Sequence, residues 1–158
     1  MKPQVLLFLK SISPTGIRFK QIAMISYQVE NNLKADEFVQ VLQRSTLGER
    51  RPIDDPERIA AMLAYGNLVL TARDNGRVVG VARSLTDFSF CTYLSDLAVD
   101  IDYQHKGIGK ELIRRTQLEA PKAKLILLAA PAAVNYYPHI GMKRHEHCFY
   151  IDNADELR

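Results

Sequence analysis

Alternation of apolar and polar residues marks the elements in the first part of the chain. Residues 25–30 alternate with a period of two, which predicts a strand. Residues 35–44 gather four apolar side chains on one side of a helix. A second helix is expected to begin after Asp55, a good N-cap residue, with Pro56 at its first position. Gly66 is expected to end this helix.

The middle of the chain predicts a hairpin followed by a buried strand. Leu68–Ala72 and Val78–Leu85 are strand-like segments, and the Asn75-Gly76 pair between them is a strong hairpin signal. The next strand begins near Cys91 and becomes almost continuously apolar over residues 94–99. Such a run is typical of a strand that is covered on both faces of a sheet.

The last part of the chain predicts a crossover that returns to the same sheet. A helix follows the buried strand and ends before Pro121, which cannot continue it. The expected later elements are an apolar strand at 125–129 parallel to 94–99, a short helix at 132–139 and a closing strand at 143–151. The pattern therefore predicts one α+β domain with a mixed sheet flanked by helices.

Composition assigns the domain to residues 24–158 and separates an N-terminal extension at 1–23. The 158 residues are 47% hydrophobic and 25% charged, as in an ordinary globular domain. The extension contains four basic residues and no acidic residue, so its net charge is +4. The net charge of the whole chain is +3, which leaves −1 for residues 24–158. We therefore expect no nucleic-acid partner for the domain. The extension is an organelle-targeting leader, a misassigned start or cloning residues, and the expected location is cytoplasmic, or plastid if it is a leader.

Two cysteines and the longest apolar run add little chemistry. Cys91 and Cys148 are far apart in sequence and fit free thiols in a reducing compartment. No run approaches the length of a membrane-spanning helix, so no membrane partner is expected. His145 and His147 share one face of the expected closing strand, but no third and fourth ligands are visible. No metal site is expected.

Two glycines at the start of the helix after the buried strand predict an anion-binding loop. Gly107 and Gly109 let the backbone approach a ligand closely, where a helix N-terminus offers free N–H groups. A P-loop is excluded because Gln104 and Glu111 stand where it requires Gly and Ser or Thr. A Rossmann fingerprint is excluded because Leu112 replaces its third glycine. A phosphate or pyrophosphate group is the expected ligand of this loop.

Gln104-x-x-Gly107-x-Gly109, after a strand ending in Leu-Ala-Val, resembles the acyl-CoA pyrophosphate loop of the GNAT superfamily of N-acetyltransferases. The resemblance covers about residues 25–151 and implies the GNAT fold, in which the two central parallel strands splay apart. It implies that the pantetheine arm of acetyl-CoA pairs with the exposed strand backbone and that the loop holds the pyrophosphate. The implied cofactor-binding residues are Leu97, Ala98, Val99, Gln104, His105, Lys106, Gly107, Ile108, Gly109, Lys110 and Asn135.

The segment 135–142 resembles the family's F-Y-x-x-x-G-F segment, which places Tyr137 on the tyrosine that protonates the departing CoA thiolate. The alternative is a core tyrosine that bonds the backbone, and Tyr136 is expected to be a packing residue. Asp96 lies inside the apolar strand and is the candidate base. Its alternative is a structural carboxylate satisfied by a neighbouring strand or an arginine.

The resemblance implies an N-acetyltransferase that moves acetyl from acetyl-CoA to a primary amine by direct attack in a ternary complex. The acceptor is a small arylalkylamine or polyamine, or a protein amine; the alternative is a non-catalytic acyl-CoA-binding sensor or interaction module. Acceptor pockets in the family are built from variable segments, here 45–58 and 86–93, and Asp87 and Tyr93 are reserve candidates for a cationic substrate. The alanine-rich segment before Tyr136 also resembles the branch with plastid and cyanobacterial arylalkylamine (serotonin-type) acetyltransferases. A homodimer is among the expected states.

Overall fold

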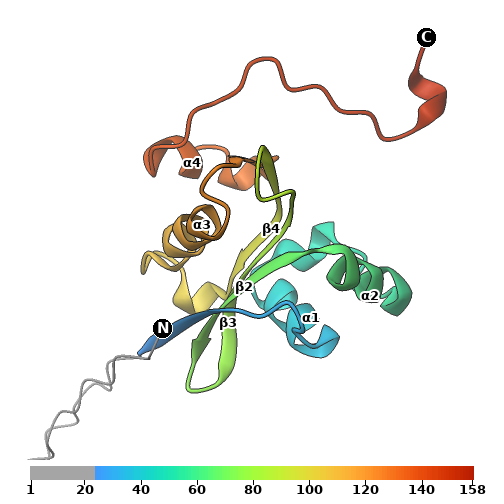
Figure 1. The fold of residues 1–158 in the computed structure, drawn as a ribbon. Coiled ribbons are helices and arrows are strands. Elements are labelled where there is room, and N and C mark those ends of the chain that lie inside the picture. The colour runs from blue at the N-terminus through green and yellow to red at the C-terminus, as the bar shows by residue number, and fades with distance from the viewer. Residues whose placement is uncertain (1–23) are drawn as a thin grey trace, which may run out of the picture.

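The computed structural model describes residues 24–158, and the expected extension at 1–23 lies outside them. Within these residues, five strands form one sheet in the order β1-β2-β3-β4-β5 (Figure 1). Neighbouring strands are antiparallel except for β4 and β5, which are parallel. The strands are β1 Ile25–Val29, β2 Leu68–Asp74, β3 Arg77–Thr86, β4 Cys91–Val99 and β5 Lys124–Ile126, and the α-helices are α1 Ala35–Arg44, α2 Pro56–Tyr65, α3 Ile108–Glu119 and α4 Tyr136–His139. The mixed sheet confirms the predicted fold class.

Helices cover both faces of the sheet. Helices α1 and α2 lie on one face and α3 lies on the other (Figure 1). Phe38, Val41 and Ile59 from α1 and α2 form one buried cluster with sheet residues. Ile108 and Leu112 from α3 form the second cluster with the opposite face. This division follows from the apolar stripe of each helix, which must be buried against a layer.

The local signals of the first part of the chain are confirmed. Helix α2 begins after Asp55, whose carboxylate accepts the backbone N–H of Arg58 at 3.0 Å. The N–H of Gly66 closes its last turn on Met62. The turn between β2 and β3 places both Asn75 and the following glycine at positive φ, as a tight hairpin turn requires.

A bulge in β4 changes which side chains face which helix layer. Arg83 of β3 pairs with Asp96 and Ser84 pairs with Leu94, so Ser95 is an extra residue in β4. Leu94 therefore packs in the cluster under α3, whereas Ala98, four residues later, packs in the cluster under α1 and α2. The same shift turns Asp96 toward the α1 and α2 side.

Strands β4 and β5 separate after three residue pairs. Cys91–Tyr93 of β4 pair with Lys124–Ile126 of β5, and the pairing stops there. The expected strand at 125–129 is thus shorter than predicted. From 94 to 99, β4 has no partner strand on its β5 side within the part of the chain that the structure describes. This confirms the expected splay of the parallel pair.

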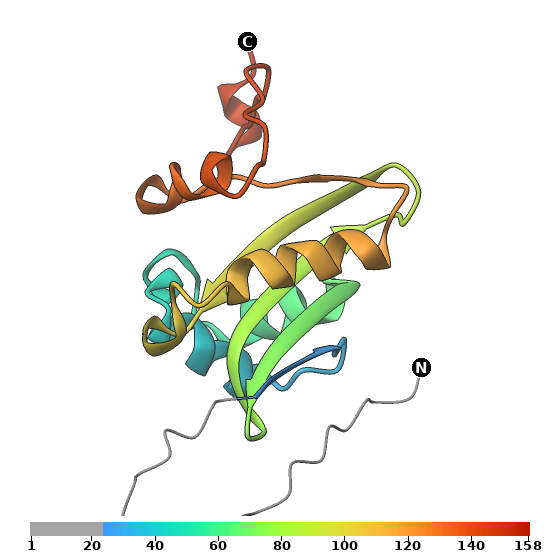
Figure 2. The same ribbon diagram turned by 90° about the vertical axis from the view of Figure 1, so that its left-hand side faces the viewer.

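The predicted closing strand at 143–151 is wrong. Residues 143–158 lead away from the sheet (Figures 1 and 2) and carry exposed apolar side chains, among them Phe149 at 89%. A strand needs a partner backbone, and these residues lie beside none in the structure. The expected helix at 132–139 divides into a 3₁₀ turn, Pro131–Ala133, and α4.

An ion-pair network ties β1, β2 and α1 together. Arg73 of β2 donates to Glu30 at 2.7 Å and to Glu37 at 2.7 Å, and Thr71 donates to Glu30 at 2.6 Å. Burial alone would raise the pKa of Glu30, but hydrogen bonds from Arg73, Thr71 and Gln28 outweigh it and hold this pKa at about 2.

This network predicts acid-dependent stability. Because the pKa of Glu30 is lower in the folded state than in the unfolded chain, its contribution is complete above about pH 5 and disappears as the pH falls toward 2. We expect a loss of about 2 kcal/mol in the free energy of unfolding across this window, measured by urea denaturation. Glu30→Gln should remove this part of the pH dependence, and an unchanged slope in that variant would contradict the assignment.

Candidate active site

The loop between β4 and α3 is fixed at its base and left-handed at its tip. The carboxylate of Asp100, which is buried, accepts the N–H of Asp102 at 3.1 Å and pairs with Arg77 at 2.9 Å. His105 and Gly107 have φ angles of 60° and 80°, just before α3 begins at Ile108. Backbone of alternating handedness at a helix start turns several N–H groups in one direction, which makes a concavity for an anion.

The two glycines of the loop have different surroundings. A Cβ added at Gly107 would meet no atom within 4 Å, so the space beside it is open. A Cβ added at Gly109 would lie 2.9 Å from the hydroxyl oxygen of Tyr136. Tyr136 of α4 therefore lies directly over the start of α3, and the open side of the loop is at Gly107.

Two side chains of the loop, Gln104 and Lys106, bond to backbone carbonyls of the protein. The amide of Gln104 donates to the carbonyl of Val99 at 3.1 Å and so joins the loop to the end of β4. Lys106 donates to the carbonyl of Asp102 at 2.7 Å and lies 4.8 Å from the centre of the Tyr103 ring. The backbone N–H groups, rather than these side chains, are the donors that the loop offers.

The remaining loop residues divide between core and solvent. Ile108 is buried and would contact any Cβ placed on Gly80 of β3, so its side chain is a core residue. His105 and Lys110 are exposed at the two ends of the anion-binding loop. Asn135 is exposed immediately before α4, and its side chain makes no capping bond there.

The unpaired edge of β4 leads directly into this loop. Leu97 and Val99 are partly buried against the α3 cluster, and Ala98 is fully packed on the opposite face. Their side chains are therefore occupied. The carbonyl of Val99 accepts the amide of Gln104, and no strand pairs with residues 94–99 on the β5 side. An extended ligand arm can pair with this edge as an added strand and end at the N-terminus of α3.

Asp96 is enclosed by two arginines. Its side chain is 0% exposed, and its two oxygens pair separately with Nε of Arg51 and Nε of Arg83, whose side chains are 23% and 6% exposed. Arg51 also donates to the carbonyl of Ser95 at 2.9 Å, and Arg83 donates to the Ser95 hydroxyl at 2.9 Å. These contacts favour the interpretation of Asp96 as a structural carboxylate that fixes the β4 bulge.

Two adjacent tyrosines lie beside the loop on α4. The rings of Tyr136 and Tyr137 meet edge to face with their centres 5.3 Å apart. Burial raises the pKa of both phenols above the usual 10, and the neighbouring Tyr136 adds to the rise at Tyr137. Both hydroxyls therefore stay protonated at neutral pH and can donate a proton or a hydrogen bond.

Comparison with known proteins shows the family of this site. Residues 34–154 match the profile of the acetyltransferase (GNAT) domain. The chain belongs to the GNAT acetyltransferase family. This confirms the predicted family.

Curated relatives match the GNAT domain over part of their length. A soybean (Glycine max) protein named histone acetyltransferase TAP1 is 34% identical over 70 residues, which are 42% of this chain and 30% of the relative. GCN5-related N-acetyltransferase 2, chloroplastic, from Arabidopsis thaliana is 30% identical over 70 residues, or 42% of this chain and 27% of the relative. The matched region thus spans less than a third of either relative.

Solved structures share the fold of the GNAT domain. A GNAT family protein, SP0256 from Streptococcus pneumoniae, aligns with a TM-score of 0.67 and 21% identity over 82% of this chain and 98% of its own. The aminoglycoside N-acetyltransferase AAC(6')-Iy, solved in complex with CoA, aligns with a TM-score of 0.66 and 14% identity over 90% of this chain and 99% of its own. No helix in the described part of the GNAT domain is both long and apolar enough to cross a membrane.

Sequence reasoning did not name the two arginines that pair with Asp96, Arg51 and Arg83. Arg83 lies in a strand whose neighbours are nearly all buried, and a charged residue in such a strand signals a buried partner. Arg51 comes from a polar link between helices and carried no such signal. Within residues 24–158 no group of three or more His, Cys, Asp or Glu side chains is close enough to hold a metal ion.

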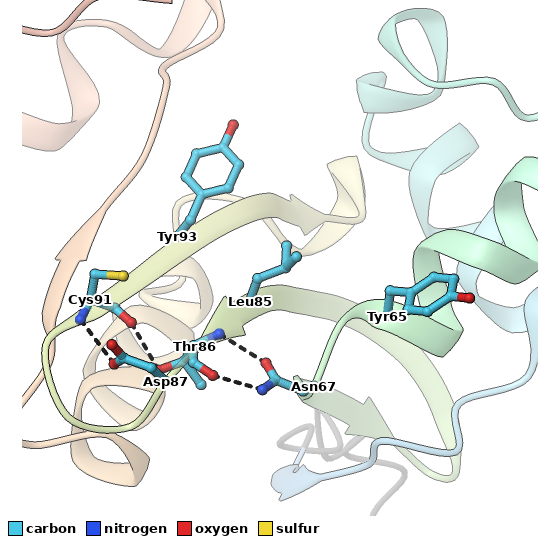
Figure 3. Close-up of a pocket in the computed structure, with 7 residues that line it drawn as sticks. All are labelled: Tyr65, Asn67, Leu85, Thr86, Asp87, Cys91 and Tyr93. Carbon is cyan, nitrogen blue, oxygen red and sulfur yellow. Dashed lines mark hydrogen bonds between the residues drawn. The ribbon is translucent and has the colours of Figure 1, made fainter.

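An open cavity of about 430 Å³ lies at the other end of the unpaired β4 edge (Figure 3). It is formed by the last residue of α2, the residues just after α2, the last residues of β3 and the first residues of β4. Its lining residues are Tyr65, Asn67, Leu85, Thr86, Asp87, Cys91 and Tyr93. Tyr93 is the last β4 residue that pairs with β5, so the cavity begins where the two strands separate.

Proposed function

We propose that this GNAT domain transfers an acetyl group from acetyl-CoA to a primary amine by direct attack in a ternary complex. The observation that carries the proposal is the unpaired edge of β4 at residues 94–99, which leads into the N–H groups at the start of α3. The edge is suited to the amide-bearing pantetheine arm, and the helix N-terminus to the pyrophosphate. The CoA complex of the aminoglycoside acetyltransferase, which shares the fold, supports this choice of co-substrate.

The proposed reaction forms one carbon–nitrogen bond, breaks one carbon–sulfur bond and moves two protons. The lone pair of a neutral amine attacks the thioester carbon, and collapse of the tetrahedral intermediate breaks the C–S bond. The electron pair goes to sulfur, and the thiolate takes a proton from Tyr137. The nitrogen gives its extra proton to water, because both oxygens of Asp96 already pair with arginines. The Tyr137 phenolate regains a proton from water, so the enzyme returns to its starting state.

A non-catalytic acyl-CoA-binding module is the alternative function. Such a module requires the same anion-binding loop, and the enclosed carboxylate of Asp96 is equally compatible with a binding module. Tyr137 is then the residue that separates the two functions, because a binding module needs no proton donor. Cytoplasmic or plastid location and a homodimer stay predictions; the name of the Arabidopsis relative supports the plastid.

Thiol release from acetyl-CoA across a panel of primary amines tests the proposed function. The panel should hold arylalkylamines, diamines and lysine-containing peptides, and the product should be identified by mass as the N-acetylated amine. Turnover with at least one amine is the expected result. Tight acetyl-CoA binding without thiol release for any amine would favour the binding module.

Gly107 and Gly76 form a matched pair that tests the pyrophosphate site. Both have positive φ, 80° and 86°, and an added Cβ meets nothing within 4 Å at either position. Alanine therefore costs a similar backbone strain of about 1–2 kcal/mol at both sites. Only at Gly107 does the methyl group enter the space proposed for the phosphates.

We expect Gly107→Ala to weaken acetyl-CoA binding by about tenfold or more, which corresponds to roughly 1.4 kcal/mol. Gly76→Ala, in the β2–β3 turn, should leave the affinity unchanged. Isothermal titration of acetyl-CoA into the two folded variants measures the difference. Equal affinities would place the pyrophosphate elsewhere.

A further inference from the structure

The cavity at the β3–β4 turn is built by specific hydrogen bonds. The side chain of Asn67 donates to the carbonyl of Thr86 at 2.7 Å and accepts its N–H at 2.8 Å (Figure 3). One carboxylate oxygen of Asp87 accepts the N–H groups of Ser89, Phe90 and Cys91 at 2.7–3.0 Å. The turn is therefore fixed, so the cavity has a defined shape before any ligand arrives.

The same turn holds a strained residue. Phe88 has a φ of 59°, an unfavourable region for an aromatic residue, and its N–H donates to the Thr86 hydroxyl at 3.0 Å. Strain of this kind persists where the surrounding bonds enforce it, and it clusters at active sites, ligand clamps and switch regions. The turn keeps this conformation next to the cavity.

The walls of the cavity are apolar, and its only charge is negative. Leu85 and Tyr93 rise from the same face of the sheet, and Tyr65 lies to one side of them at the end of α2 (Figure 3). The side chains of Tyr65 and Leu85 are 77% and 41% exposed. Exposed apolar side chains that gather around a cavity often mark a ligand-binding site. Of the seven lining residues, Asp87 alone is charged.

The carboxylate of Asp87 stays ionised. The N–H groups of Phe90, Ser89 and Cys91 lower the pKa of Asp87 below its usual value. They all bind the same oxygen, Oδ1, and leave the second oxygen for a ligand. The cavity thus offers apolar contact together with one fixed negative charge.

Distance along β4 separates this charge from the unpaired edge, along which the proposed acetyl-CoA arm lies. The backbone of Asp87 bonds to that of Cys91, and Cys91 is four residues before the bulge at Ser95. At about 3.3 Å per residue the separation is roughly 13 Å. An attacking amine must be neutral, so a cation that pairs with Asp87 must be a second group on the same molecule.

We propose that the cavity binds the acceptor, and that the acceptor is a primary amine with a second cationic group beyond an apolar spacer. The spacer lies against Tyr65, Leu85 and Tyr93, the far cation pairs with Asp87, and the near amine enters the gap between β4 and β5. This inference rests on the proposed function and adds the substrate class to it.

Paired ligands test the second charge. The kcat/KM values of 1,4- to 1,8-diaminoalkanes are compared with those of 1-aminoalkanes of the same chain length. An exposed ion pair contributes little, so we expect a preference of about three- to fivefold for the best diamine, lost at 1 M salt. Asp87→Asn should abolish the preference, because its side-chain oxygen can still accept the three N–H groups and only the charge is removed.

Asp36→Asn, which removes an exposed carboxylate in the first turn of α1, is the matched control and should retain the preference. Turnover of mono- and diamines at equal efficiency would overturn the inference and leave the proposed function standing. If no amine is turned over, binding of the same ligand pairs to the CoA-loaded protein gives the same comparison. Equal binding of mono- and diamines, or a preference that survives in Asp87→Asn, would then overturn the inference.

Discussion

Asp96→Asn is expected to lower the melting temperature by about 10 °C. The substitution removes the one negative charge between two guanidinium groups, of which Arg83 is buried and Arg51 is largely so. Removing one partner of a buried ion pair costs about 3–5 kcal/mol, because the remaining charge loses its compensation. At about 2–4 °C per kcal/mol in a chain of this size, the loss is easily seen by calorimetry.

Asp100→Asn is the matched control for this effect. Asp100 is also buried, but it pairs with one arginine, Arg77, whose side chain is 48% exposed. Its substitution should cost roughly 1–2 kcal/mol, since solvent can screen the arginine that is left. If Asp96→Asn melts close to the unmodified protein but loses more than about 10²-fold in kcat, Asp96 is the general base after all.

Tyr137→Phe is expected to reduce kcat by about 10²–10⁴-fold, the range of one general acid, with little change in the affinity for acetyl-CoA. Phenylalanine keeps the ring and its packing and removes only the proton donor. The loss should shrink with an acyl donor whose thiol is more acidic, because that leaving group needs less help. Since the pKa of Tyr137 is raised above 10, kcat should show no alkaline decline from this residue below that pH.

The neighbouring tyrosine provides the control. Tyr136→Phe removes a hydroxyl from the same short helix, at a position over Gly109. We expect it to change kcat by only a few-fold and to act mainly on acetyl-CoA affinity. A normal kcat in Tyr137→Phe together with a large loss in Tyr136→Phe would exchange the roles of the two residues.

The parts of the fold that sequence predicted are those with a local cause. Asp55 caps its helix through a residue three positions away, and the Asn75-Gly76 pair sets its own turn. The anion-binding loop before α3 also has a local cause, because its glycines and the helix N-terminus are neighbours in the chain. Each of these features depends on a few adjacent residues.

The parts that sequence did not predict depend on distant partners. Arg51 lies 45 residues from Asp96, and nothing near either residue indicates that they meet. The bulge at Ser95 depends on how β3 and β4 pair, and an apolar run of residues does not reveal it. The closing strand failed for the same reason: alternation marks a segment that can form a strand, but the partner strand decides whether it does.

The gap beside β4 also bears on how the protein behaves at high concentration. An unpaired strand edge is a template for another chain, and proteins usually protect such edges with lysine, proline or inward-pointing charge. Residues 94–99 contain one charged residue, and its charge is already neutralised by two arginines. A ligand arm that pairs with this edge covers it against other chains. By this argument, the proposed acetyl-CoA complex should aggregate less readily than the ligand-free protein.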